Sequence, residues 1–154
     1  MSNVPVICIV GRAKSGRTTL LEKLIRELKR RGYRVGTVKH HSHPGFEVDK
    51  PGKDTWRHAQ AGSDHVVIAA PDKIASIRRV DKEPGLDEIT AGMTDVDVIL
   101  TEGYLRTGRL RIEVVRAERS TEPICTADEL IALATDVAVP YDVPQFDLDD
   151  AYGL

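Results

Sequence analysis

The chain has 154 residues and carries 22 basic against 24 acidic side chains, for a net charge of -2. This length suits one domain over 1–154, and the near-neutral charge gives no support for a nucleic-acid or membrane-surface partner. No apolar run reaches the roughly 20 residues that a membrane helix needs. Cys8 and Cys125 form neither a CxxC motif nor a disulfide framework. By elimination, we expect a cytoplasmic protein.

The start of the chain reads as a β–α–β unit. Val4–Val10 is a short, β-branched apolar run that suits a strand buried on both faces of a parallel sheet. Residues 18–31 place leucine and isoleucine at helical spacing, which predicts an amphipathic helix. Residues 34–39 predict a second strand. Such crossovers are almost always right-handed.

The rest of the chain alternates between helix and strand patterns. The predicted elements are helices over 52–61 and 86–93, strands over 65–70 and 73–80 as a hairpin, and strands over 96–101, 110–115 and 131–134. The segment after Tyr141 gives weak signals, and no element is assigned to it. This order predicts an α/β fold with a mostly parallel sheet and an antiparallel portion.

A phosphate-binding loop lies between the first strand and the first helix. Its residues are Gly11-Arg12-Ala13-Lys14-Ser15-Gly16-Arg17-Thr18. The glycines let successive N–H groups converge on a phosphate, and the helix directs its N-terminus at the same anion. Thr18 supplies the hydroxyl that binds Mg²⁺ in such loops, and Thr19 extends the predicted nucleotide site. The loop predicts a three-layer fold similar to P-loop NTPases.

Arg17 stands where the strict loop motif has lysine. Its guanidinium keeps the charge but is wider than an ammonium group, so phosphate binding is expected and efficient hydrolysis is not. Lys14 and Arg12 could add compensating charge. The alternative is a strand-to-helix turn that binds nothing.

Three further polar side chains are expected beside the loop. Glu102 follows a buried strand at the carboxyl edge, where ligands of α/β sheets bind. It could hold Mg²⁺ through water or, as the catalytic residue, orient an attacking water, or it could be a solvated loop glutamate. Asp49 is the second Mg²⁺ candidate beside Thr18, and Lys39 could meet a phosphate or the substrate.

Histidines and basic residues elsewhere admit two interpretations each. A zinc site is one interpretation of the cluster His40, His41 and His43. A role near the nucleotide or substrate is favoured, because these histidines follow a strand in a polar loop. The remaining basic candidates are Lys53, Arg57, Arg106, Arg109 and Arg111. They form either a solvated rim or a surface for an anionic substrate.

The strand over 131–134 brings Thr135 and Asp136 to the sheet edge, if it runs parallel to the first strand. A carboxylate there can accept two hydrogen bonds from N1–H and N2–H₂ of guanine, whereas adenine offers neither donor. We therefore expect GTP to be preferred over ATP. The alternative is that Asp136 caps the following turn.

The chain resembles the MobB family, the molybdopterin-guanine dinucleotide biosynthesis proteins B. The matching stretches are the phosphate loop with Thr18-Thr19-Leu20, Val38 to His41, Phe46 to Asp54, Ala61-Gly62, Leu100 to Tyr104 and Ile131 to Asp136. The resemblance implies a homodimeric GTP-binding protein with feeble GTPase activity at most. It would assist the partner enzyme MobA, which joins GMP to molybdopterin. Two positions depart from the family pattern. Arg17 stands where the family has lysine. The basic residue that commonly follows the Glu-Gly-aromatic triplet comes one position later here, as Arg106 after Leu105.

Two other classes of function compete with this interpretation. A small-molecule kinase would use residues 104–111 as an arginine-bearing lid, although the segment is brief for a lid and leads into a strand. The third class is a non-catalytic interaction module that has lost nucleotide binding. The argument for it is Arg17, which replaces the lysine of the loop motif. Binding of labelled GTP and ATP separates these classes.

Overall fold

The computed structural model describes residues 4–154, which form two compact units. We call residues 4–40 with 86–154 the sheet unit, and residues 41–85 the hairpin unit. Each is described by itself. None of the helices in the described part of the chain is long and apolar enough to cross a membrane.

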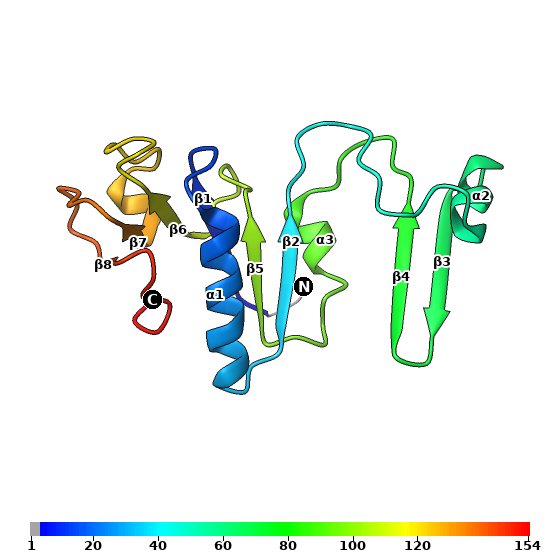
Figure 1. The fold of residues 1–154 in the computed structure, drawn as a ribbon, viewed down its shortest axis with the longest axis horizontal. Coiled ribbons are helices and arrows are strands. Elements are labelled where there is room, and N and C mark those ends of the chain that lie inside the picture. Colours follow the sequence, from blue (N-terminus) through cyan, green and yellow to red (C-terminus); the bar gives the residue numbers. More distant parts are fainter. Residues whose placement is uncertain (1–3) are drawn as a thin grey trace. The chain divides into compact units, whose positions relative to one another are not determined.

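The sheet unit contains six parallel strands. They are β1 (Val6–Gly11), β2 (Val35–Lys39), β5 (Val98–Glu102), β6 (Leu110–Val115), β7 (Leu130–Thr135) and β8 (Gln145–Phe146). Their spatial order is β2-β5-β1-β6-β7-β8, and every neighbouring pair is parallel (Figure 1). All six carboxyl ends therefore lie at one edge of the sheet.

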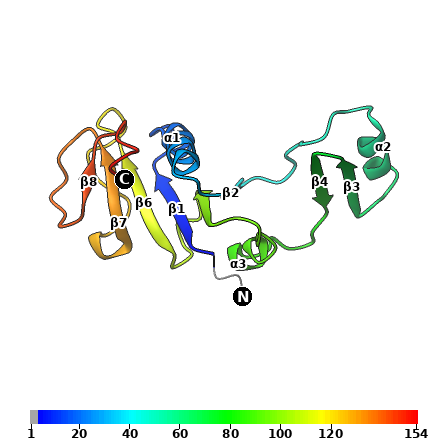
Figure 2. The same ribbon diagram turned by 90° about the horizontal axis from the view of Figure 1, so that it is seen from below.

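Helices cover both faces of this sheet. Helix α1 (Arg17–Arg30) and helix α3 (Leu86–Thr90) lie on opposite sides of it (Figure 2). On the α1 side the leucines of the helix pack against alternate residues of β1, β5, β6 and β7. On the other side Leu86 joins a second cluster that includes both cysteines. The three-layer α/β prediction is confirmed.

The hairpin unit holds the antiparallel portion that the sequence predicts. Helix α2 (Asp54–Gln60) precedes β3 (His65–Ala70) and β4 (Lys73–Arg78), which pair with each other in antiparallel register. This portion is a separate two-stranded sheet, not part of the six-stranded one. Several apolar side chains of the hairpin lie in solvent, since Ile68 is 56% exposed and Ile74 73%.

The segment after Tyr141 contains strand β8, which the sequence did not predict. Strand β8 has only two residues, so no alternation can mark it. The side-chain amide of Gln145 donates to the carbonyl oxygen of Val139 (2.7 Å) and accepts the N–H of Val139 (3.1 Å). This tertiary contact, which no local pattern announces, holds β8 against the chain that follows β7.

A buried glutamate anchors the loop that leaves β6. Glu113 is 1% exposed although it lies in the middle of that strand. Its two carboxylate oxygens accept the N–H groups of Ile124 (2.7 Å) and Cys125 (3.0 Å). A buried carboxylate is stable only with such partners. Glu113 therefore ties residues 116–125 to the sheet edge.

We predict that Glu113→Gln lowers the free energy of unfolding by roughly 1–3 kcal/mol, because the amide nitrogen would face an N–H donor and leave it unsatisfied. Urea denaturation monitored by circular dichroism measures the loss. Glu118→Gln is the matched control, since this side chain is 71% exposed. Equal midpoints for the two variants would contradict the role of Glu113.

Candidate functional site

The loop from Gly11 to Gly16 curls tightly between β1 and α1. Gly11, Lys14 and Gly16 all have positive φ angles, at 145°, 60° and 99°. The N–H of Ser15 donates to the carbonyl of Arg12 (3.2 Å), which closes a turn within the loop. A Cβ on Gly11 would lie 2.7 Å from the carbonyl oxygen of Val114, so only glycine fits beside β6.

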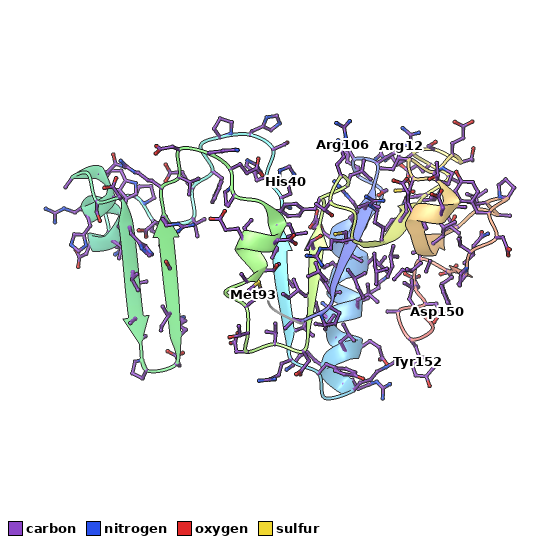
Figure 3. All side chains as sticks on the ribbon, turned by 180° about the vertical axis from the view of Figure 1, so that it is seen from behind. Arg12, His40, Met93, Arg106, Asp150 and Tyr152 are labelled. Atoms are coloured by element: carbon purple, nitrogen blue, oxygen red, sulfur yellow. The ribbon has the colours of Figure 1, made fainter. Side chains whose placement is uncertain are left out.

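The N-terminus of α1 is open. Gly16 is its N-cap residue, no side chain caps the free N–H groups, and the first turn contains no acidic residue. Such an end carries a partial positive charge and unsatisfied donors. The side chains of Arg12, Lys14 and Arg17 have no carboxylate partner within residues 4–154, and Figure 3 shows Arg12 at this edge. The cradle therefore suits a polyanion.

Glu102 joins Thr18 and Lys39 at the end of β5. The Thr18 hydroxyl donates to Oε2 of Glu102 (2.9 Å), and Nζ of Lys39 lies 3.5 Å from Oε1. The parallel register that pairs Lys39 with Glu102 explains the second contact. Glu102 is buried, so its carboxylate is held rather than solvated. A hydroxyl and a carboxylate that converge beside the loop fit a hydrated Mg²⁺.

Asp49 belongs to the hairpin unit, where its Oδ1 accepts the N–H of Lys50 (2.8 Å). Its role as a Mg²⁺ ligand stays a prediction.

The histidine rings make aromatic contacts. The ring centroids of His40 and Tyr104 lie 4.9 Å apart, and those of His41 and His43 lie 6.1 Å apart. Over residues 4–154, no three His, Cys, Asp or Glu side chains gather in a way that could hold a metal ion.

Asp136 lies at the end of β7 and is held by the loop after β6. Its Oδ1 accepts the N–H of Ala117 (2.7 Å). Thr135 organises the turn that follows β7, because its hydroxyl donates to the carbonyl of Val137 (2.7 Å) and accepts the N–H of the same residue (3.1 Å). The Asp136 carboxylate is thus oriented while its residue stays exposed.

A shallow, open hollow of about 330 Å³ lies on the surface beside Asp136. Its walls are residues 135–138, at the end of β7 and after it, and residues 145–147, at and after β8. Ligand pockets for small molecules have this order of volume. Phe146 offers an aromatic wall and Asp147 a second carboxylate, whose Oδ1 accepts the N–H of Asp149 (2.9 Å). A flat polar ring with several donors would suit these walls.

Two of the arginines that the sequence singled out are neutralised. Arg111 lies buried in β6, where its Nη1 donates to Glu129 (2.9 Å), and Arg109 pairs with Asp87. Because Arg111 is buried in a strand, it does not belong to a solvated rim.

Residues after β8 close over α1, which sequence patterns did not indicate. Lys23 of the helix pairs with Asp149, and Arg31 donates to the carbonyl of Tyr152 (2.7 Å). Figure 3 shows Tyr152 and Asp150 on this returning segment beside α1. The hydrogen bond from Lys23, with smaller contributions that include the charge of Arg116, holds the pKa of Asp149 below its usual value. The segment therefore links the hollow beside Asp136 to helix α1.

We predict that Gly11→Ala destabilises the protein by roughly 1–3 kcal/mol, because the new methyl group would collide with the Val114 backbone. Gly92→Ala is the control, since a Cβ there meets nothing within 4 Å. Thermal or urea denaturation compares the two. A Gly11→Ala protein as stable as the wild type would show that the loop is looser than described.

Comparisons with known proteins agree on one family. Residues 6–136 match the family model of molybdopterin guanine dinucleotide synthesis protein B, MobB. A molybdopterin-guanine dinucleotide biosynthesis adapter protein of Haemophilus influenzae is 37% identical over 96% of this chain and 84% of its own length. The protein of the same name from Escherichia coli is 34% identical over 98% of this chain and 89% of its own.

Solved structures show the same fold. A molybdopterin-guanine biosynthesis protein B (mobB) superposes with a TM-score of 0.73 at 31% identity, covering 96% of this chain and 93% of that one. MobB of Bacillus subtilis gives a TM-score of 0.77 at 22% identity, covering 97% and 93%, which supports the fold alone. The matched family model and the two relatives above 30% identity establish that the chain belongs to the MobB family.

Proposed function

We propose that this protein is a GTP-binding adapter of molybdenum-cofactor biosynthesis. It acts in the formation of molybdopterin guanine dinucleotide, beside a MobA-like guanylyltransferase. Membership of the MobB family supports the pathway, because the relatives are named adapter proteins of this biosynthesis. A cytoplasmic location and a single nucleotide-binding domain over 1–154 stay predictions.

The observation that carries nucleotide binding is the open N-terminus of α1 behind the glycine-bearing loop. Its unsatisfied N–H groups and its cations without carboxylate partners favour the phosphates of a nucleotide. The phosphate contacts are assigned to residues 11–19, with Lys39 at the rim. Arg17 supplies charge without the compact shape of lysine, so any hydrolysis is weak.

Mg²⁺ is proposed as the second ligand. Thr18 contributes its hydroxyl, Glu102 acts through a bound water, and Asp49 is the additional carboxylate that the sequence suggests. The 2.9 Å contact between Thr18 and Glu102 supports the first two assignments. Glu102 is also proposed to orient an attacking water, because its carboxylate lies next to the loop and is fixed by two partners.

Guanine is proposed to occupy the hollow beside Thr135 and Asp136. The anchored carboxylate supports this choice, since an oriented acceptor pairs well with N1–H and N2–H₂. The hollow of about 330 Å³ leaves room for a purine. No observation favours the kinase alternative, and the comparisons contain adapter proteins instead.

A homodimer is proposed from the family resemblance and from the hairpin unit. Both β3 and β4 are edge strands of a two-stranded sheet, and such hairpins are rarely stable alone. Apolar side chains on both of its faces are exposed, with Val67 at 54% and Ile68 at 56%. A second copy of the chain would cover this surface.

The base assignment predicts that Asp136→Ala weakens GTP binding by about 2–3 kcal/mol and leaves weak ATP binding nearly unchanged. Asp136→Asn should keep the Ala117 contact yet lose the preference for GTP, because an amide offers only one acceptor oxygen. Equilibrium binding of labelled GTP and ATP, with and without Mg²⁺, measures both.

The control for this experiment is Asp142→Ala, an exposed aspartate between β7 and β8 that does not line the hollow. It should bind GTP like the wild type. Equal losses for GTP and ATP in both Asp136 variants, or a wild type that prefers ATP, would remove Asp136 as the base reader.

The dimer assignment predicts that Ile74→Lys yields a monomer, because a charge would replace an apolar side chain that is 73% exposed in one copy. Sedimentation velocity at micromolar concentration measures the state. Lys73→Gln, on the same strand, should stay dimeric. A monomeric wild type, with and without nucleotide, would contradict the proposal.

A further inference from the structure

Arg116 lies next to the phosphate loop but comes from a distant part of the chain. It follows β6 directly, and its Nε donates to the carbonyl oxygen of Ser15 (3.1 Å). Its Nη2 lies 3.0 Å from where a Cβ on Gly16 would be. Because Gly16 is the N-cap of α1, the guanidinium sits at the open end of that helix.

The backbone around Arg116 is fixed by the turn it begins. Its carbonyl oxygen accepts the N–H groups of Arg119 (2.8 Å) and Ser120 (3.0 Å). The next N–H, of Ala117, donates to Asp136 (2.7 Å). Arg116 is thus attached to the loop by its side chain and to the base-side carboxylate by its neighbour. A side chain held this firmly is oriented before any ligand arrives.

No carboxylate forms an ion pair with Arg116 within residues 4–154, although its charge contributes to the lowered pKa of Asp149. Elsewhere in the sheet unit, Arg30, Arg34 and Arg111 each pair with a carboxylate at 2.9 Å or less. Arg116 is half-buried, and over residues 4–154 no hydrogen bond from its two Nη groups and no ion pair is found. Glu113 and Glu122 line the same small cavity, but Glu113 is occupied by two backbone N–H groups.

A half-buried guanidinium that lies beside the cations of the loop and has no ion pair is available to an anionic ligand. We propose that Arg116 is a phosphate-binding residue that acts from outside the loop. Its Nη groups contact the phosphates of a nucleoside di- or triphosphate while Nε stays on Ser15. This assignment rests on the proposed nucleotide function, and it explains how a loop without the usual lysine gathers enough positive charge.

The test compares wild type with Arg116→Ala, Arg116→Lys and the control Arg119→Ala. Arg119 lies on the same turn, is 41% exposed and has a carboxylate neighbour in Glu118. Calorimetric titration with Mg²⁺-GTP and with pyrophosphate gives the dissociation constants. We expect a rise of about 10- to 100-fold in Arg116→Ala, a smaller rise in Arg116→Lys, and no change in Arg119→Ala.

The melting temperature of each protein, measured with and without GTP, separates phosphate binding from a purely structural role. If Arg116 serves a ligand, added GTP should raise the melting temperature of Arg116→Ala less than that of the wild type. If Arg116→Ala melts at a lower temperature without ligand but binds GTP as tightly as the wild type, the inference is overturned. Arg116 would then only support the structure of the loop. If wild type binds GTP and Arg116→Ala binds it equally, only this inference falls. If wild type binds neither GTP nor pyrophosphate, the proposed function falls with it.

Discussion

The parallel arrangement of the six strands is the constraint on which the rest of this structure depends. Because every strand points the same way, Gly11, Lys39, Glu102 and Thr135 all reach one edge of the sheet. The first helix begins at that edge without a side-chain cap, and its donors face the same region. Electrostatics then favours an anion there, and the side chains nearby need only to orient it.

The chain that leaves β6 connects the two halves of the proposed site. Arg116 holds Ser15 of the loop, and Ala117 holds Asp136 at the end of β7. Glu113 in turn fixes Ile124 and Cys125 at the far end of that connection. A ligand that bound loop and hollow together would therefore meet groups that are already positioned relative to each other, so little ordering would be required on binding.

Local patterns in the sequence predicted most of the fold but not all of the site. Val4–Val10, the glycine-bearing loop and the leucines of α1 carry signals within a few residues of each other, and the structure agrees with them. Arg116 meets Ser15 across 101 residues, and β8 depends on a side chain of Gln145, so neither leaves a periodic trace. Glu113 did leave a signal in the sequence, because it is a charged residue inside an apolar strand. Its burial could have been predicted from that position.

A crystal structure with GTP and Mg²⁺ bound is the most direct measurement. We expect the phosphates on residues 11–18, the metal within bonding distance of the Thr18 hydroxyl, and guanine in the hollow between residues 135–138 and 145–147. The Asp136 carboxylate should accept hydrogen bonds from the base while it keeps the N–H of Ala117. A nucleotide bound away from the loop, or a base that avoids this hollow, would contradict the assignment of a GTP-binding adapter built on this sheet edge.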